Sequence, residues 1–247
     1  VRPLALELCA GHPGYTAALY DHGFEAIGVD WQHNQHDSVI PVMSVDLSSQ
    51  AGQDLIMRII DGGRVKYVHM GPPCGTASRA RDKRVPAWLR KRGAPDPKPL
   101  RSDKFPRGLP SLDENPLAKK KVLTANAIYD FCISVALRAL KDHFGFTIEN
   151  PENSYLWQIP EMLLLSRQPG VEKVSFDSCM WGAKRQKKTS LLTNMPPISD
   201  MAVRCDGKHD HLPWGVRWKE GWSFATADEC EYPAELCNAM AVRAAGY

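Results

Sequence analysis

The sequence lacks several features that would assign it to a common class of protein. It has no apolar run near the roughly 20 residues that a membrane-spanning helix needs, and no secretory signal pattern precedes its first predicted strand. The seven cysteines are scattered and show no disulfide spacing, which favours a reducing, intracellular compartment. The patterns of a P-loop and of a G-x-G-x-x-G dinucleotide site are also absent. We therefore expect no membrane association and no P-loop nucleotide chemistry.

Positive charge is concentrated in one part of the chain. Residues 79–121 hold 14 Lys and Arg against 5 Asp and Glu, although the whole chain has a net charge of only +3. Residues 79–116 also hold seven of the 19 prolines and little hydrophobic periodicity, which predicts a long loop. A basic segment on a slightly acidic body favours a polyanionic partner, with a solvated, disordered loop as the alternative.

Apolar and amphipathic segments alternate along the chain. We expect strands at residues 4–9, 25–30, 40–46, 65–70, 144–148, 171–176 and 189–193, and helices at 15–22, 50–60, 117–141 and 232–245. This alternation predicts an α/β fold with a mostly parallel sheet, whose ligands bind beyond the carboxyl ends of the strands.

Residues 195–231 are irregular and rich in Trp, Gly, His and Asp. Their tryptophans, Trp214, Trp218 and Trp222, are expected to form a small local core, with stacking on nucleobases as the alternative.

A glycine turn follows the first predicted strand. Gly11 and Gly14 allow a ligand to approach the backbone, and the helix that follows offers free N–H groups to a carboxylate or phosphate. Asp30 and Asp46 close the next two strands, where Asp30 is placed to accept bonds from ribose hydroxyls and Asp46 from an adenine amino group. Trp31 offers a ring for stacking. A helix cap or loop role is the alternative for each acid.

Cys74 follows the fourth predicted strand. Pro72 and Pro73 fix the backbone before it, and the small residues after it leave the sulfur accessible. Nearby cations and helix N-termini would favour its thiolate, so the segment predicts a nucleophile, with a buried structural cysteine as the alternative. Because position 77 is Ala, the P-C-x-x-C pattern of zinc deaminases is absent.

Glu149 closes the fifth predicted strand and is followed by Asn150. A partly desolvated carboxyl group at this edge is a plausible proton donor near neutral pH, and a loop cap is the alternative.

Cys205, His209 and His211 form a C-x3-H-x-H cluster. A fourth zinc ligand would come from one of three other cysteines, Cys179, Cys230 or Cys237. The spacing fits no standard zinc finger, so we expect no metal here and keep zinc as the alternative.

These motifs, in this order and over nearly the whole chain, resemble the DNA cytosine-C5 methyltransferases, particularly phage-like or mobile-element-like domains of that family. Residues 6–15 are similar to the family's first motif, 73–74 to its Pro-Cys nucleophile motif and 149–150 to the Glu-Asn motif that holds the target base. Residues 181–189 resemble the basic motif beside the catalytic pocket, and 231–233 with the following helix resemble the last motif.

The chain departs from the family pattern at several positions. Pro13 replaces a usual glycine, and Pro151 replaces a usual valine. In the basic motif, Arg185 stands where Gln is common, Lys187 where Arg is common and Thr189 where a second Arg is common. None of these changes affects the expected nucleophile.

The resemblance implies a Rossmann-like fold of the class I S-adenosylmethionine-dependent methyltransferases, with a mostly parallel seven-stranded sheet and helices on both faces. Residues 1–194 and 232–247 would form the catalytic domain, in which 75–116 would be a mobile basic catalytic loop. Residues 195–231 would be a short target-recognition region.

The resemblance also implies the site residues. S-adenosylmethionine would be the cofactor and S-adenosylhomocysteine its product, with expected contacts at Glu7, Cys9, Ala10, Gly11, His12, Gly14, Asp30, Trp31, Asp46 and Pro72. The expected catalytic residues are Cys74, Glu149 and Arg185, and the expected substrate contacts are Pro73, Ser78, Arg79, Asn150, Lys187 and Lys188.

The implied activity is methylation of C5 of a cytosine flipped out of DNA, through a covalent adduct with Cys74. DNA is then the expected partner, and the expected location is intracellular, in the nucleus if the source is a eukaryote. Two alternatives stay open, namely an RNA cytosine-C5 methyltransferase on the same scaffold and a catalytically silent nucleic-acid-binding domain of a larger polyprotein.

Overall fold

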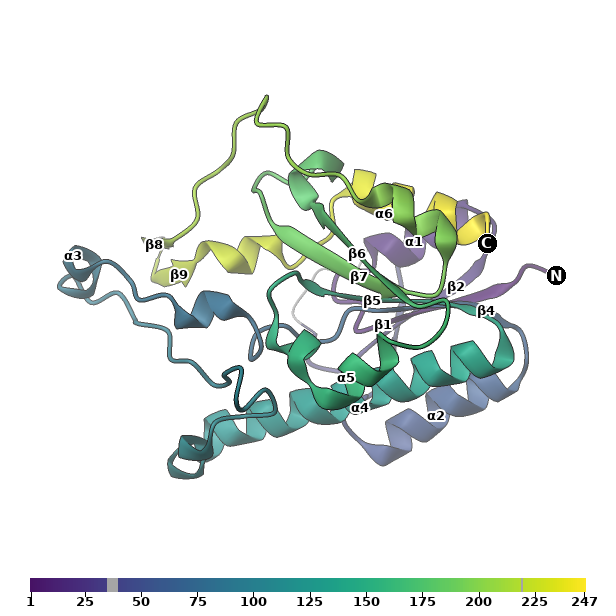
Figure 1. Ribbon diagram of the computed structural model, residues 1–247, viewed down its shortest axis with the longest axis horizontal. Coiled ribbons are helices and arrows are strands. Elements are labelled where there is room, and N and C mark those ends of the chain that lie inside the picture. Colours follow the sequence, from purple (N-terminus) through teal and green to yellow (C-terminus); the bar gives the residue numbers. More distant parts are fainter. Residues whose placement is uncertain (35–39, 219) are drawn as a thin grey trace.

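The computed structural model describes residues 1–34, 40–218 and 220–247 (Figure 1). Its strands are β1 (Leu4–Leu8), β2 (Glu25–Asp30), β3 (Val42–Ser44), β4 (Val65–Met70), β5 (Gly145–Pro151), β6 (Glu172–Asp177), β7 (Lys188–Thr193), β8 (Val216–Trp218) and β9 (Trp222–Phe224). Its α-helices are α1 (Gly14–Asp21), α2 (Gln50–Asp61), α3 (Ala87–Arg90), α4 (Pro116–Asp142), α5 (Pro160–Leu165) and α6 (Ala234–Ala245).

Seven strands form one mixed sheet in the order β3-β2-β1-β4-β5-β7-β6. The first five are parallel, and only β7 runs against its neighbours β5 and β6. The order β3-β2-β1-β4-β5 is that of the doubly wound Rossmann fold. The predicted Rossmann-like α/β fold with a mostly parallel seven-stranded sheet is therefore confirmed.

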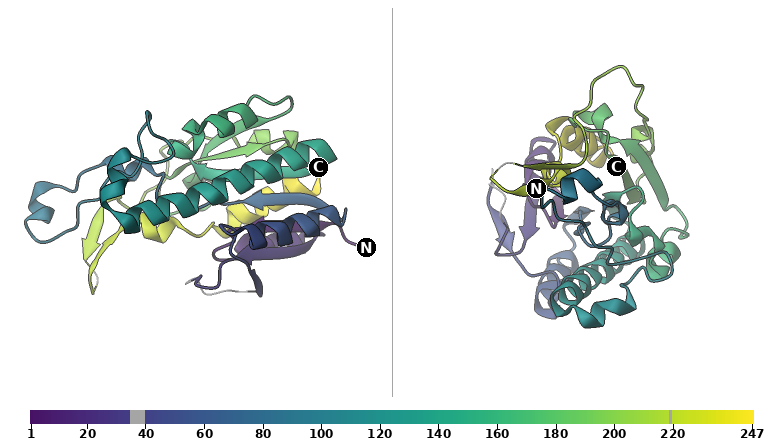
Figure 2. Two further views of the ribbon diagram at one scale, coloured as in Figure 1. Left: turned by 90° about the horizontal axis from the view of Figure 1, so that it is seen from below. Right: turned by 90° about the vertical axis from the view of Figure 1, so that its left-hand side faces the viewer.

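Helices cover both faces of the sheet, which lies between them in Figures 1 and 2. On one face, apolar side chains of β1, β4 and β5 pack against α2, α4 and α5. On the other face, Ala5 and Tyr67 pack against α1 and α6. Helix α4 is long and apolar enough to cross a membrane by length and composition. Half of its most apolar stretch is buried inside the fold, which is typical of a core helix.

Side chains cap the starts of α2 and α4, the two longest helices on their face of the sheet. Ser49 accepts a hydrogen bond from the Gly52 amide at the start of α2. Asn115 accepts from the Ala118 amide at the start of α4, where Pro116 takes the first helical position. These caps explain why both helices begin where the sequence predicts.

The segment 195–231 is less irregular than expected, because β8 and β9 form a hairpin. The rings of Trp218 and Trp222 meet edge to face at 5.2 Å. However, Trp218 is 66% exposed and Trp214 is also exposed. The expected tryptophan core is therefore not formed, and these rings lie on the surface.

The loop 75–116 has a docked base and a projecting tip. The buried Arg101 donates to Asn126 Oδ1 and Pro106 O at 2.7 Å each, and to Thr76 Oγ1 at 2.9 Å. Leu100 and Leu112 pack with a side chain of α4. Residues 83–97, which include α3, project from the body (Figures 1 and 2). The loop therefore combines a base held by contacts with the body and a tip that extends away from it.

Candidate active site

The carboxyl ends of four neighbouring strands bring the predicted site residues to one edge of the sheet. Leu8, at the end of β1, is the register partner of Met70 in β4, and Met70 is the partner of Ile148 in β5. The glycine turn and the Cys74 segment therefore follow adjacent strand ends, Glu149 lies near the carboxyl end of β5, and Asp30 closes β2 on the other side of β1. This is where ligands bind in open α/β sheets.

Hydrogen bonds from two other elements hold the Cys74 segment. Asn150 Nδ2 donates to Pro72 O at 3.0 Å, and Tyr129 Oη donates to Pro73 O at 2.6 Å. The Cys74 carbonyl itself accepts from the amides of Ala77 and Ser78. The backbone on both sides of the half-buried cysteine is thus fixed by β5, α4 and its own turn.

The surroundings of Cys74 act in opposite directions on its ionisation. Burial raises the pKa of the Cys74 thiol, the positive charge of Lys187 lowers it, and the carboxylate of Glu149 raises it again. The net pKa is above the ordinary value of a cysteine. The expectation that the surroundings favour a thiolate is therefore not met in this arrangement, because burial and Glu149 outweigh Lys187.

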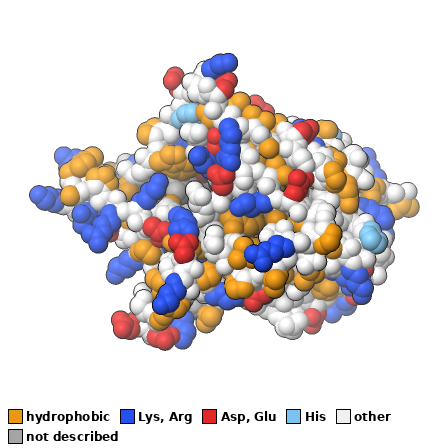
Figure 3. Space-filling view, in the orientation of Figure 1, with side chains coloured by type: hydrophobic (Ala, Val, Ile, Leu, Met, Phe, Trp, Pro, Cys, Tyr) orange, Lys and Arg blue, Asp and Glu red, His pale blue; other side chains and the backbone are white. Residues whose placement is uncertain are grey.

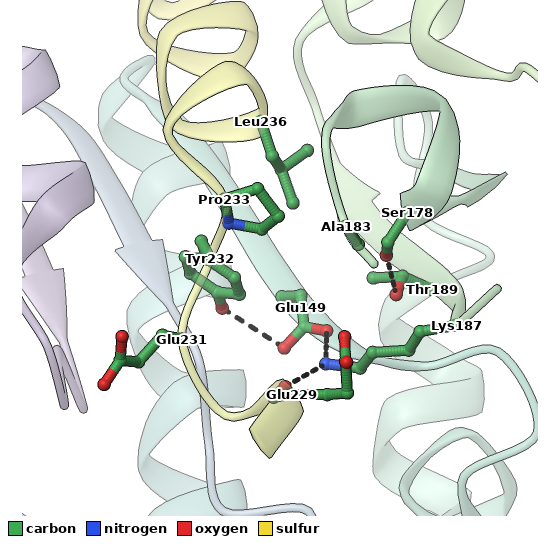
Figure 4. A pocket seen from close by; sticks show the side chains of 10 residues that line it. All are labelled: Glu149, Ser178, Ala183, Lys187, Thr189, Glu229, Glu231, Tyr232, Pro233 and Leu236. Atoms are coloured by element: carbon green, nitrogen blue, oxygen red, sulfur yellow. Dashed lines mark hydrogen bonds and ion pairs between the residues drawn. The ribbon is translucent and has the colours of Figure 1, made fainter. Parts of the chain in front are cut away.

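A small pocket lies beside Glu149 and Lys187, the two residues whose charges act on Cys74, and Cys74 itself is not among the residues that line it (Figure 4). Lys187 Nζ reaches across it to within 3.6 Å of Glu149 Oε1 and donates to Glu229 O at 3.2 Å. Burial works against the charge of Lys187, but Glu149, Cys74 and Glu229 raise its pKa above the ordinary value. The residues that line the pocket are Glu149, Ser178, Ala183, Lys187, Thr189, Glu229, Glu231, Tyr232, Pro233 and Leu236.

Arg185, expected to be catalytic, points elsewhere. Its buried guanidinium donates to Glu229 Oε1 at 2.8 Å, lies 3.2 Å from Asp228 Oδ2 and donates to Pro213 O at 3.1 Å. A buried cation requires such partners. Arg185 therefore holds the 195–231 segment in place through these contacts. Lys187, two residues later, supplies the cation of the pocket.

A buried chain of hydrogen bonds ends at Glu149. Tyr232 Oη donates to Glu149 Oε2 at 3.2 Å and lies 3.1 Å from His69 Nε2. His69 Nδ1 lies 2.7 Å from Thr147 Oγ1, which lies 2.6 Å from Tyr67 Oη. Burial lowers the pKa of His69 to about 3, so its ring is neutral. Since Tyr232 gives its proton to Glu149, we infer that His69 carries its hydrogen on Nε2 and accepts from Thr147 at Nδ1.

The sequence interpretation missed His69, Thr147 and Tyr129 as supporting residues. His69 and Thr147 are register partners in adjacent central strands, and Glu7 is the partner of His69 in β1. Such buried strands are normally apolar throughout. Glu7, His69 and Thr147 are polar residues inside short apolar runs, and this pattern was the signal that could have revealed them.

Glu7, expected to contact the cofactor, lies inside the fold. Its carboxylate accepts a 2.7 Å bond from the Thr16 amide and a second bond from the Thr16 hydroxyl, in the first turn of α1. Burial raises the pKa of Glu7 to about 8, and the Thr16 bonds only partly oppose this. Glu7 therefore positions α1 rather than facing the open edge of the sheet.

Replacing Glu7 with glutamine should change the pH dependence of stability. The folded protein keeps the Glu7 proton up to about pH 8, whereas the unfolded chain loses it near 4.5, so the free energy of unfolding falls as pH rises between these values. Glu7→Gln keeps an acceptor for Thr16 and cannot ionise, so it should flatten this fall. Urea unfolding across the window measures the effect, with the exposed Glu25→Gln as control. An unchanged pH slope would contradict the assignment.

The turn after β1 retains features suited to a cofactor. Cys9 and Gly11 have left-handed backbone conformations, with φ of 61° and 54°. Asp30 Oδ2 accepts from the Gly11 amide at 2.6 Å and Oδ1 from the Trp31 amide at 2.7 Å. Trp31 is 54% exposed, so its ring is available for stacking. The start of α1 has no side-chain cap and no acid in its first turn, which suits an incoming carboxylate.

Of the remaining expected cofactor contacts, Ala10, His12 and Gly14 belong to this turn, whereas Asp46 has another role. The Ala10 amide bonds to Val29 O, and the Gly14 amide bonds to the carbonyl of the half-buried His12. Asp46, by contrast, accepts from the Ser48 amide at 2.9 Å and from its hydroxyl. The loop role is therefore the one that Asp46 shows.

Three expected substrate contacts, Ser78, Arg79 and Lys188, do not line the pocket. Ser78 caps the short 3-10 helix that follows it, through a 3.2 Å bond from the Ala80 amide. Arg79 pairs with Asp103 in the loop base. Lys188 is exposed at the first position of β7. Of the other expected substrate contacts, Asn150 holds the Cys74 segment, Pro73 is held within it by Tyr129, and Lys187 lines the pocket.

No family model and no curated protein sequence matches this chain. Among solved structures, it is similar to a crystal structure of a mutant DNMT2 from Spodoptera frugiperda. The two chains share 14% sequence identity with a TM-score of 0.40, over 86% of this chain and 56% of the DNMT2 chain. The chain thus spans a little more than half the length of that protein.

Proposed function

We propose that this chain is an S-adenosylmethionine-dependent methyltransferase that acts on C5 of cytosine in DNA, with Cys74 as the nucleophile. The proposal rests on the convergence of Cys74, Glu149 and Lys187 at the ends of β4 and β5, next to the glycine turn that follows β1. A thiol whose ionisation responds to a nearby carboxylate and a nearby cation supplies the groups needed to activate a pyrimidine ring.

The residues of the turn fit the proposed cofactor. The uncapped start of α1 suits its carboxylate, and Asp30 with the exposed ring of Trp31 suits its ribose and adenine. When bound, S-adenosylmethionine supplies an electrophilic methyl group.

The chain's own residues would supply the remaining chemistry. Cys74 would lose its proton to solvent, and its sulfur would form a bond to C6 of cytosine, which makes C5 nucleophilic enough to accept the methyl group, with S-adenosylhomocysteine as the leaving group. Lys187 favours the thiolate by lowering the Cys74 pKa, against the net effect of burial. Glu149 would lie against N3 and stabilise the charge that gathers on the ring. Loss of the C5 proton to a base then breaks the sulfur–C6 bond and restores Cys74.

A polyanionic substrate is favoured by the loop tip. Residues 83–97, which form this tip, hold five Lys and Arg and one Asp. Trp88 of α3 is exposed, and a Cβ atom placed on Gly93 would lie 3.6 Å from Trp222 Nε1, so the tip adjoins the β8–β9 hairpin. Figure 3 shows Lys and Arg side chains gathered on this projecting end of the molecule. A basic surface with exposed aromatic rings suits a nucleic acid whose target base is flipped out.

Incubation with labelled S-adenosylmethionine and matched DNA and RNA duplexes tests the proposal. We expect 5-methylcytosine in the DNA, identified by mass spectrometry of its nucleosides. Label found only in RNA would move the substrate class to RNA. Binding of DNA without product from either substrate would overturn the proposal and support the silent nucleic-acid-binding alternative.

A further inference from the structure

Four metal-binding side chains meet on the surface next to the pocket, outside the proposed chemistry. The donor atoms of Cys179, Cys205, His209 and His211 all lie within 4.8 Å of one another. Cys205 Sγ is 3.6 Å from His211 Nε2 and 3.8 Å from His209 Nε2. Cys179 lies in the 3-10 helix Ser178–Trp181 that follows β6, and the other three lie in the loop after Met201. The fold thus brings together ligands that are far apart in the sequence.

We propose that these four residues bind a structural zinc ion. Two thiolates and two imidazoles are a common ligand set for zinc. With bond lengths of about 2.3 Å to sulfur and about 2.0–2.1 Å to nitrogen, a tetrahedral ion separates sulfur from nitrogen by about 3.6 Å. The two sulfur–nitrogen distances around Cys205 are 3.6 and 3.8 Å. Both distances match tetrahedral spacing, and all four donor atoms lie within 4.8 Å of one another, so small side-chain movements would complete the site.

Neighbouring groups support the ligands. Asp206 Oδ1 lies 3.6 Å from His209 Nδ1, on the opposite side of the ring from the nitrogen that faces Cys205. Such a carboxylate fixes the orientation and tautomer of a histidine ligand. The Gly207 amide donates to Cys205 Sγ at 3.4 Å, and the Cys205 amide donates to Asp177 Oδ2 at 2.8 Å. The sulfur and the backbone of Cys205 are thus held by hydrogen bonds, and a carboxylate lies near the far side of the His209 ring.

The ion would fasten the surface loop to the wall of the pocket. Beyond His211, the Leu212 amide donates to Lys184 O at 2.9 Å, and Pro213 O accepts from Arg185 Nε at 3.1 Å. Ser178, adjacent to Cys179, lines the pocket itself. Four protein ligands close the coordination of zinc, so the role is structural rather than catalytic. This inference does not depend on the proposed function.

The sequence favoured no metal here because its local spacing matched no standard zinc finger. That spacing covers only Cys205, His209 and His211. The structure identifies Cys179 as the fourth donor and does not place Cys230 or Cys237 in the cluster. Only the packing of the loop against the end of β6 makes the set complete.

Elemental analysis of the purified full chain tests the proposal. We expect about one zinc per chain. Cys205→Ser and His211→Ala should each lower the zinc content by roughly 10-fold or more after dialysis. Cys230→Ser and His143→Asn are matched controls, since Cys230 and His143 are exposed and outside the cluster. Zinc retained by both cluster variants would overturn the assignment of these ligands.

A second measurement uses the unaltered chain, in case the variants fail to fold. Loading with cobalt(II) should give the intense visible bands of a tetrahedral ion and a thiolate charge-transfer band. A chelator should remove these bands and lower the melting temperature. A folded chain that takes up neither zinc nor cobalt, or a cobalt spectrum without thiolate bands, would overturn the proposal. Neither readout involves methyl transfer.

Discussion

Replacing Cys74 with alanine is expected to lower methyl transfer to DNA by roughly 10⁴-fold or more, as loss of a covalent nucleophile does in other enzymes. Without the sulfur, C6 of the base has no attacking group and C5 stays too weakly nucleophilic to react. The fold should persist, because Pro72, Pro73 and the Cys74 carbonyl keep the backbone bonds that hold the segment. Transfer of labelled methyl groups under single-turnover conditions measures the effect.

Cys230→Ser is the matched control, because it removes an exposed thiol from the same side of the molecule. DNA that carries 5-fluorocytosine adds a second readout. Fluorine cannot leave C5 as a proton does, so the unaltered chain should stay covalently attached to this DNA in a denaturing gel. The Cys74→Ala chain should not. Full transfer or a stable adduct in the Cys74→Ala chain would reject Cys74 as the nucleophile.

Replacing Lys187 with methionine is expected to slow methyl transfer by roughly 10²-fold or more, a loss typical of removing one electrostatic group from a catalytic pocket. Lys187 is the charge that lowers the Cys74 pKa, whereas burial and Glu149 raise it. Its removal leaves Glu149 without its 3.6 Å ion pair. The thiolate fraction at a given pH must then fall, and the pH profile of Cys74 alkylation must shift to higher pH.

Alkylation by iodoacetamide across a range of pH, followed at the Cys74 peptide by mass spectrometry, measures this shift without cofactor or DNA. Lys184→Met is the control, because it removes an exposed lysine from the same segment, whereas Lys187 is the cation that lowers the Cys74 pKa. A profile that shifts equally in both variants, or in neither, would contradict the role given to Lys187. Normal methyl transfer by Lys187→Met would exclude it from the chemistry.

Periodicity predicted most of the sheet. The segments 25–30 and 65–70 match β2 and β4 residue for residue. Gly23 and Gly63, which have positive φ angles, follow the ends of the preceding helices, and a glycine that ends a helix in this way can be recognised in the sequence. The expected strand at 40–46 is reduced to Val42–Ser44. The short β8–β9 hairpin was missed because it buries little apolar surface and carries no alternating pattern.

The positions of site residues were predictable where the end of a strand determines them. They were less predictable where they depend on which side chains form ion pairs. Cys74 follows β4 and Glu149 lies near the carboxyl end of β5, so the topology of these neighbouring strands brings them to one edge. Arg185 and Lys187 stand two residues apart in one basic segment, and either could have entered the pocket. The acids of 228–229 decide between them by pairing with Arg185. Those acids come from a distant segment, so no local pattern shows the pairing.

Arg101 has a mechanical consequence for the long loop. Its guanidinium lies 5.2 Å from the ring centre of Tyr129, whose hydroxyl holds the carbonyl of Pro73. The anchor of the loop and the backbone beside Cys74 therefore share one aromatic support. Under the proposed function, a nucleic acid bound at the projecting tip would pull on this anchor. We then expect binding at the tip to affect Cys74 through Arg101 and Tyr129, without any movement of the sheet.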